Sequence, residues 1–145
     1  MTQELDRFLS AQALVHDQAL AELRRGRKTS HWMWFIFPQI AGLGHSETAQ
    51  FYAIRDAAEA RAYLAHPLLG PRLIEATRTV TAAPGSATAI LGEIDALKLR
   101  SSLTLFDAAG APPAVAHALD TFFPAPDPMT LRLIGRSLSA PATPA

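Results

Sequence analysis

Apolar residues recur at helical spacing in the first part of the chain. Between residues 5 and 23 six apolar side chains fall close to helical spacing, and Thr2 can be the N-cap of this helix. The six are Leu5, Phe8, Leu9, Val15, Ala19 and Leu23. Arg24 and Arg25 suit the negative end of the helix dipole, and Gly26 can end the helix in the left-handed conformation. The pattern therefore predicts a first helix that ends at Gly26.

The same periodicity returns in segments that are separated by capping residues and proline. Ser46 is placed to begin a helix that runs through Ile54, and Asp56 is placed to begin another over residues 57–65. Pro67 interrupts the pattern and suits the first position of the next helix. These segments predict a series of short helices with tight junctions.

Proline also marks the helices expected in the second half of the chain. Pro112 or Pro113 can open a helix that extends to Phe123, and Asp127 is an N-cap followed by Pro128 at the first helical position. The inward-facing residues of the last helix are expected to be Leu131, Ile134 and Leu138.

Residues 91–106 form a dense stretch that reads as a single helix. Polar residues interrupt both of its apolar stripes, which is unusual for a helix in a core. One stripe holds Asp95, Lys98, Leu99, Ser102 and Phe106, and the adjacent stripe holds Ile94, Leu97, Ser101 and Leu105.

Six bulky apolar residues at positions 32–37 form the most hydrophobic run, which is too short to cross a membrane. Helix and buried strand are hard to separate over such a length, and helix is favoured because no neighbouring stretch supplies a strand partner. Ser30 can cap this segment, and Pro38 ends it. The sum is an all-α, compact single-domain bundle of about eight short helices over residues 1–138, with a frayed tail at 139–145.

Composition narrows the function classes. Thirteen Lys and Arg residues balance thirteen Asp and Glu residues, so the chain has no global charge that favours nucleic acid or an anionic membrane. The absence of cysteine and of close histidine spacings argues against a metal site, and no cofactor is implied. The acidic start has no apolar signal core, so we expect a cytoplasmic protein, monomeric or weakly dimeric.

Two stretches, residues 26–39 and residues 91–106, contain side chains that could bind or transform a ligand. In the first, an indole would stack on a flat ring while polar side chains bind its edge and an anionic group. The candidates there are Arg27, Lys28, His31, Trp32, Trp34 and Gln39. The alternative is that the aromatic residues are core and that the two cations form a solvated corner.

The second stretch offers an acid and cations on one helix. Asp95, Lys98, Ser101 and Ser102 would need polar partners if they are buried. Alternatively, Asp95 caps this helix or pairs with Lys98 along it.

Long blocks of the sequence resemble the domain-of-unknown-function family 1810. The main blocks are residues 26–39, residues 66–73 and residues 95–106. The resemblance implies a mainly helical fold and no assigned activity. Family members are sometimes labelled calpastatin, but that inhibitor is a disordered repeat chain, and this sequence has neither repeats nor a disordered composition. The family is also distantly similar to NADAR domains, which are tied to N-glycosidic chemistry on nucleotide- or ADP-ribose-like substrates.

On this basis we predict a small-molecule site between the two stretches. If the site is catalytic, Asp95 and His31 are the acid/base candidates for cleaving an N-glycosidic bond. The alternative is a non-enzymatic protein-interaction module, which predicts that much of residues 32–37 is exposed.

Overall fold

Nine α-helices account for most of residues 2–139, the part of the chain that the computed structural model describes. They are α1 (Thr2–Arg25), α2 (Met33–Ile36), α3 (Glu47–Phe51), α4 (Ala57–Ala65), α5 (Leu69–Ala82), α6 (Ala87–Leu91), α7 (Glu93–Ala108), α8 (Pro113–Phe122) and α9 (Pro128–Ser139). Within these residues the only β-type pairing is an isolated bridge between Ile40 and Ile54. The prediction of an all-α fold is confirmed. Residues 140–145 of the predicted tail lie outside the described residues.

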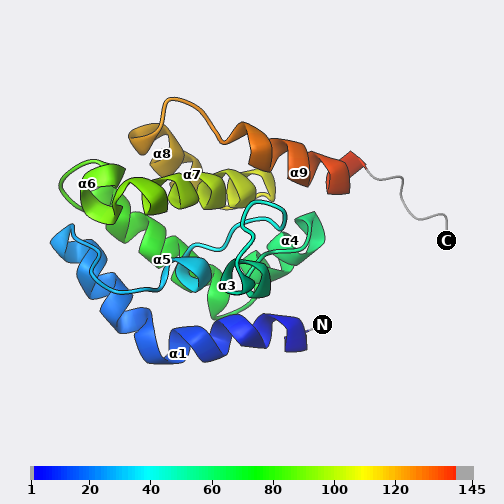
Figure 1. Ribbon diagram of the computed structural model, residues 1–145, viewed down its shortest axis with the longest axis horizontal. Helices are drawn as coiled ribbons and strands as arrows, with labels where there is room; N and C mark the ends of the chain where they lie inside the picture. Colours follow the sequence, from blue (N-terminus) through cyan, green and yellow to red (C-terminus); the bar gives the residue numbers. More distant parts are fainter. Residues whose placement is uncertain (1, 140–145) are drawn as a thin grey trace.

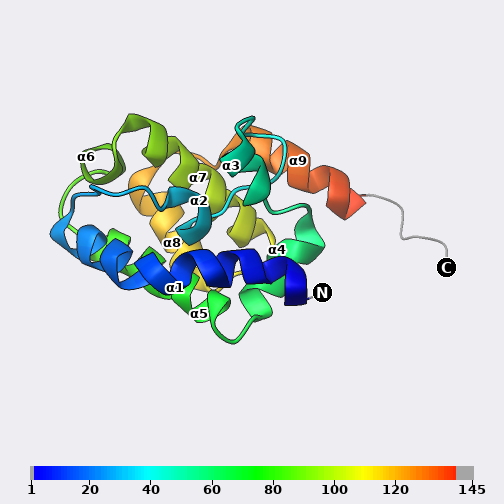
Figure 2. The same ribbon diagram turned by 60° about the horizontal axis from the view of Figure 1, so that its bottom comes forward.

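The helices pack in layers around α5 and α7. In Figure 1, α1 lies along the bottom of the molecule and α8 and α9 lie at the top, with α5 and α7 between them. Helices α6, α8 and α9 pack against α7, and α4 contacts both α5 and α7. Figure 2 shows that the short helix α2 lies between α1 and the central helix α7.

The second half of α7 lies in the interior on all sides. Residues 101–106 are six consecutive buried positions, which is the pattern of a helix surrounded by protein. The first two turns are different, because the side chains of Ile94 and Leu97 are exposed. One end of α7 is thus anchored in the core, and the other reaches the surface.

Helix α1 ends as the sequence predicts. Gly26 adopts a φ of 77°, and its N–H donates to the carbonyl of Leu23 at 3.0 Å. The N–H of Arg27 donates to the carbonyl of Glu22, also at 3.0 Å. These two bonds form a Schellman motif, which reverses the chain and starts the loop to α2.

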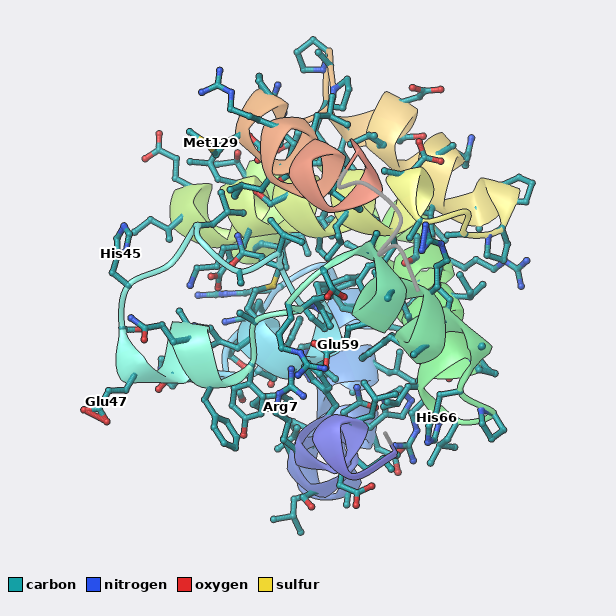
Figure 3. The ribbon with its side chains drawn as sticks, turned by 90° about the vertical axis from the view of Figure 1, so that its right-hand side faces the viewer. Arg7, His45, Glu47, Glu59, His66 and Met129 are labelled. Atoms are coloured by element: carbon teal, nitrogen blue, oxygen red, sulfur yellow. The ribbon has the colours of Figure 1, made fainter. Side chains whose placement is uncertain are left out.

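Arg7 connects α1 to the region around α4. Its guanidinium donates to the carbonyls of Phe51 at 2.7 Å and Ala53 at 2.8 Å, and to the carboxylate of the buried Glu59 at 3.2 Å. Figure 3 shows the Arg7 and Glu59 side chains pointing toward one another. Because a buried carboxylate needs a charged or hydrogen-bonded partner, this contact fixes how α4 sits on α1.

Three predicted N-caps are confirmed. The side chains of Ser46, Asp56 and Asp127 accept hydrogen bonds from N–H groups in the first turns of α3, α4 and α9. Pro113 rather than Pro112 is the first residue of α8. The N-cap predicted at Thr2 involves a side chain outside the described ones.

Two predicted helix starts are wrong. Ser30 does not cap α2, because its hydroxyl donates to Glu22 instead. Pro67 does not begin α5, which starts at Leu69. The N-cap residue is Leu68, and His66 Nδ1 accepts from the N–H groups of Leu68 at 3.1 Å and of Leu69, the first residue of α5, at 3.2 Å.

Other differences concern helix limits and one helix face. Helix α3 ends at Phe51, because the N–H of Ile54 donates to the carbonyl of Gln39 and forms the β-bridge. Residues 91–106 are divided at Gly92, which has a φ of 90° and separates α6 from α7. Leu131 is exposed rather than inward, whereas Ile134 is buried as expected. The side chain of Leu138 is outside the described ones.

Candidate functional site

A buried carboxylate organises the loop between α1 and α2. Glu22 is completely buried, and its Oε1 accepts from the backbone N–H groups of Thr29 at 2.7 Å and Ser30 at 2.9 Å. The indole N–H of Trp32 donates to the same oxygen at 2.9 Å, while the Ser30 hydroxyl and the Gln18 amide donate to Oε2. The loop is therefore held in one conformation by a single acceptor.

The protonation state of Glu22 follows from these contacts. Burial alone would raise the pKa of its carboxyl, but the hydrogen bonds from Ser30, Thr29, Gln18 and Trp32 lower the pKa far below the ordinary value of 4.5. The group is thus a carboxylate at neutral pH, which all its donors require.

The same loop brings a lysine to the start of α7. The N–H of Lys28 donates to the carbonyl of Ile90 at 2.8 Å, which fixes the loop against α6. The Lys28 ammonium lies 2.8 Å from Oδ2 of Asp95, and the Lys98 ammonium lies 3.5 Å from Oδ1. Lys28 and Lys98 are the only lysines in the chain, and both contact one carboxylate. Two positive groups share one negative group, so the cluster keeps one positive charge.

This cluster lies in an open cavity of about 470 Å³, which we call the lysine cleft. It is lined by Lys28, His31, Met33, Trp34, Leu91, Gly92, Glu93, Ile94, Asp95 and Lys98. The volume and the mixture of apolar walls with a few polar groups are typical of small-molecule sites. The Lys98 ammonium stands 4.9 Å from the ring centroid of the half-buried Trp34, within the range of a cation–π contact.

The start of α7 adds to the character of the cleft. Its N-cap is Gly92, which provides no side-chain hydrogen bond, unlike the serine and aspartate caps of α3 and α4. The first N–H groups of a helix carry partial positive charge. They add positive potential to a lining that holds the two ammonium groups and the two carboxylates of Asp95 and Glu93.

Five of the predicted site residues meet in the lysine cleft and five do not. Those that meet are Lys28, His31, Trp34, Asp95 and Lys98. Arg27 is exposed and Gln39 is half-buried, and neither lines the cleft. Trp32 is fully buried, with its indole N–H bound to Glu22, so it has no exposed face on which a ring could stack.

The two serines lie on other faces of α7. The Ser101 hydroxyl donates at 3.2 Å to the carbonyl of Leu97 and lies 3.2 Å from the Asp127 carboxylate at the start of α9. Ser102 is completely buried, and its hydroxyl has no hydrogen-bond partner among the described residues. Both serines therefore belong to helix packing around α7.

Sequence reasoning missed several residues that shape the cleft. Glu22 gave one available signal, because an acidic residue beside Leu23 and Ala19 interrupts the inward face of α1. Gly92 gave another, since a glycine inside a predicted helix marks a break or a close approach. Glu93 carried no such signal, because acidic residues are common in the first turn of helices.

A larger cavity of about 780 Å³ lies along α5. Three of its ionisable groups serve other contacts, because Arg72 donates to the Gln12 side chain at 3.3 Å and His16 lies 3.4 Å from the Glu75 carboxylate, and the exposed Arg78 also lines it. Its lining has no indole or phenyl ring. The lysine cleft, in which cations and an indole converge, is therefore the better candidate.

Metal-binding clusters and membrane-spanning helices are both absent from the described residues. No group of three or more histidine, cysteine, aspartate or glutamate residues among them is arranged to hold a metal ion. Likewise, no described helix combines the length and apolar character needed to cross a membrane.

The fold and the cleft together define a small α-helical protein with a half-open, amphiphilic cleft. The chain belongs to the family of proteins of unknown function DUF1810, whose model matches residues 2–134. Its structure is similar to the crystal structure of the conserved hypothetical protein Rv1873 from Mycobacterium tuberculosis, with a TM-score of 0.89 and 46% identity over 91% of this chain and 96% of that chain. Among functionally curated proteins, none matches.

Proposed function

We propose that this protein binds a nucleotide-like small molecule in the lysine cleft and cleaves its N-glycosidic bond. The observation that carries the proposal is the convergence of both lysines of the chain on Asp95, beside Trp34, in an open cavity. A ligand of this kind combines a flat ring with an anionic group. The cleft offers an indole for the ring and two ammonium groups for the anion.

Binding requires a small rearrangement. The Lys98 ammonium stands over the Trp34 ring, and the Lys98 side chain is 26% exposed, so it can swing toward an incoming phosphate. That movement uncovers the indole face for the ring of the ligand. Lys28 is more confined, with 9% of its side chain exposed, and it supplies a fixed positive charge.

The remaining groups suit the chemistry of an N-glycosidic bond. Asp95 would stabilise the oxocarbenium-like charge that develops on the sugar, and would accept the proton of the attacking water. His31, which is exposed at the mouth of the cleft, would donate a proton to the departing ring as the carbon–nitrogen bond breaks. The distant resemblance of the family to NADAR domains supports the same substrate class.

The alternative of a protein-interaction module rested on an exposed aromatic run, and that expectation is wrong. Four of the six residues are buried, namely Trp32, Met33, Ile36 and Phe37. Trp34 and Phe35 are half-buried. Ligand binding is therefore the function that the segment supports best.

Calorimetry with adenosine monophosphate, ADP-ribose and adenine tests the proposal. We expect the two anionic ligands to bind, adenine to bind much more weakly, and Lys98→Met to reduce the affinity for the anionic ligands about tenfold or more, because a charge-assisted contact is lost. Asp95→Asn should retain binding but lose the release of free nucleobase, measured by chromatography. Arg61→Met, which removes an exposed charge on α4, is the matched control and should change neither property.

Failure would take a definite form. If neither anionic ligand binds, or if Lys98→Met binds them as the unmodified chain does, the cleft is not the site. If both bind but no nucleobase is released, the binding function stands and the cleavage does not.

A further inference from the structure

Two apolar side chains on α7 are exposed beside the lysine cleft. Ile94 is 72% exposed and Leu97 is 61% exposed, although each belongs to a helix whose other half is buried on all sides. Leu97 directly precedes Lys98, and Ile94 directly precedes Asp95. The first two turns of α7 therefore present polar groups to the cleft and apolar groups to the adjacent surface.

These apolar residues border a second cavity of about 400 Å³, which we call the apolar concavity. Phe122 and Phe123, at the end of α8, form its opposite wall, and their rings pack against each other at 6.2 Å. The side chain of Ala96 lies at its base. Ser86, Thr88 and Glu93 are its polar members. A lining with two exposed aliphatic residues, two phenyl rings and two alanines is otherwise the composition of a site for an apolar group.

The apolar concavity adjoins the lysine cleft. Glu93 and Ile94 line both, so the two cavities lie on either side of the first turn of α7. A substituent on a molecule bound in the cleft has to pass only the exposed side chains of Glu93 and Ile94 to reach the concavity. The exposed carboxylate of Glu93 stands at the junction, where it can accept a hydrogen bond from a polar link.

We infer that the ligand of the lysine cleft carries an apolar substituent that lies in the apolar concavity. This inference rests on the proposed function, because the anionic and ring parts of the ligand are assigned to the cleft. It narrows the substrate class to a nucleotide-like anion that bears an aromatic or short aliphatic group, joined through a hydrogen-bond donor such as an amine or amide. The donor binds Glu93, and the apolar group packs between Leu97 and the two phenyl rings.

A matched pair of ligands tests the inference. Adenosine monophosphate and its N6-benzyl derivative have the same charge and differ by one apolar group on a nitrogen that retains a proton. Because burying several carbon atoms contributes a tenfold factor or more, the benzyl derivative should bind the unmodified chain at least about tenfold more tightly. Leu97→Ser should remove this gain and leave the Kd of adenosine monophosphate unchanged.

Control variants make the result specific. Leu97 and Ile94 are exposed, so replacing either with serine should leave the melting temperature unchanged, and Ile94→Ser provides a second removal of the apolar wall. Leu14→Ser, at a 90% exposed position on α1, is the matched control and should retain the full gain.

The outcomes separate this inference from the proposed function. If adenosine monophosphate binds and the benzyl group adds no affinity, or if the gain survives in both Leu97→Ser and Ile94→Ser, the inference is wrong while the proposed function stands. If neither ligand binds, the proposed function fails and the inference fails with it.

Discussion

At the scale of single residues, Glu22 has the largest structural effect on the cleft without lining it. Its two oxygens accept five hydrogen bonds, four of them from backbone or side-chain groups of residues 29–32. Since a buried carboxylate is costly unless its lone pairs are used, the loop and the carboxylate depend on each other. The position of Lys28 next to Asp95 follows from this arrangement.

We predict that Glu22→Gln destabilises the protein by roughly 2–4 kcal/mol, because an amide nitrogen cannot accept the hydrogen bonds that one carboxylate oxygen accepts. Urea denaturation measures the free energy of unfolding. Glu47→Gln, at an exposed position in α3, is the control and should change it by a few tenths of a kcal/mol only. A loss of less than about 1 kcal/mol in Glu22→Gln would contradict the role given to the carboxylate.

The pKa of Glu22 also predicts the response to acid. The pKa is lower in the folded chain than its ordinary value of 4.5, so the unfolded chain takes up the proton first as the pH falls. The stability that Glu22 contributes is therefore complete above about pH 4.5 and is lost progressively below it. The free energy of unfolding should fall more steeply with acid in the unmodified chain than in Glu22→Gln, and equal slopes would refute this account.

At the scale of the elements, helix caps that depend on neighbouring residues could be predicted from the sequence, and contacts between distant residues could not. Ser46, Asp56 and Asp127 cap helices through bonds to residues three positions away, so short stretches of sequence suffice to find them. Ser30 has the same local chemistry, but a buried carboxylate from α1 takes its hydroxyl. The residues next to Ser30 in the sequence do not indicate that Glu22 will bind its hydroxyl in place of the helix N-terminus.

The candidate site divides in the same way. The polar residues of both stretches could be identified because ionisable groups beside apolar runs need partners. The meeting of Lys28 with Asp95 is a contact over 67 positions of chain, which depends on the packing of α6 on α7 and on the hydrogen bond of Lys28 to Ile90 of α6. The sequence pattern of α7 did not show which of its faces the other helices cover. It therefore could not show that Ser101 and Ser102 point away from the cleft.

The break between α6 and α7 provides a test at the scale of elements. Gly92 has φ 90° and ψ 162°, a backbone region that is essentially restricted to glycine, and an added Cβ would meet no atom within 4 Å. Gly92→Ala should therefore cost about 2 kcal/mol from backbone strain alone. Gly135→Ala is the control, because Gly135 lies within α9 with equally open space around it.

The control should change stability in the opposite direction. Alanine is preferred to glycine inside a helix, so Gly135→Ala should raise the free energy of unfolding by about 0.5–1 kcal/mol. Thermal and urea denaturation of both variants measure the difference. If both substitutions are stabilising, the conformation assigned to Gly92 is incorrect.

At the scale of the whole molecule, the cleft is a product of layer packing. Its two walls come from the loop before α2 and from the start of α7, which the sequence separates widely. Helix α7 is fixed at its far end by the core, and the loop is fixed by Glu22, so the backbone of both walls is supported while the Lys98 side chain can move. A site built on supported elements of this kind can hold charged groups at short distances before any ligand arrives.

The reactivity of the two lysines reports whether the two walls of the cleft meet at Asp95. An amine-selective acetylating reagent has only Lys28 and Lys98 as side-chain targets, and mass spectrometry distinguishes them. We expect both to react more slowly in the folded chain than in urea, because Asp95 holds both ammonium groups. Lys98, whose side chain is 26% exposed, should react before Lys28, whose side chain is 9% exposed.

Removing the shared carboxylate should release both amines together. Asp95→Asn is expected to increase the rate at Lys28 and at Lys98, since each loses the carboxylate that holds its ammonium group in place. Asp120→Asn, at an exposed position on α8, should leave both rates unchanged. If Asp95→Asn accelerates only Lys98, its neighbour on the same helix, the cluster is a local contact of α7 and the two layers do not meet there. Acceleration of Lys28 as well would require that residues 67 positions apart share one carboxylate, which is the contact on which the cleft depends.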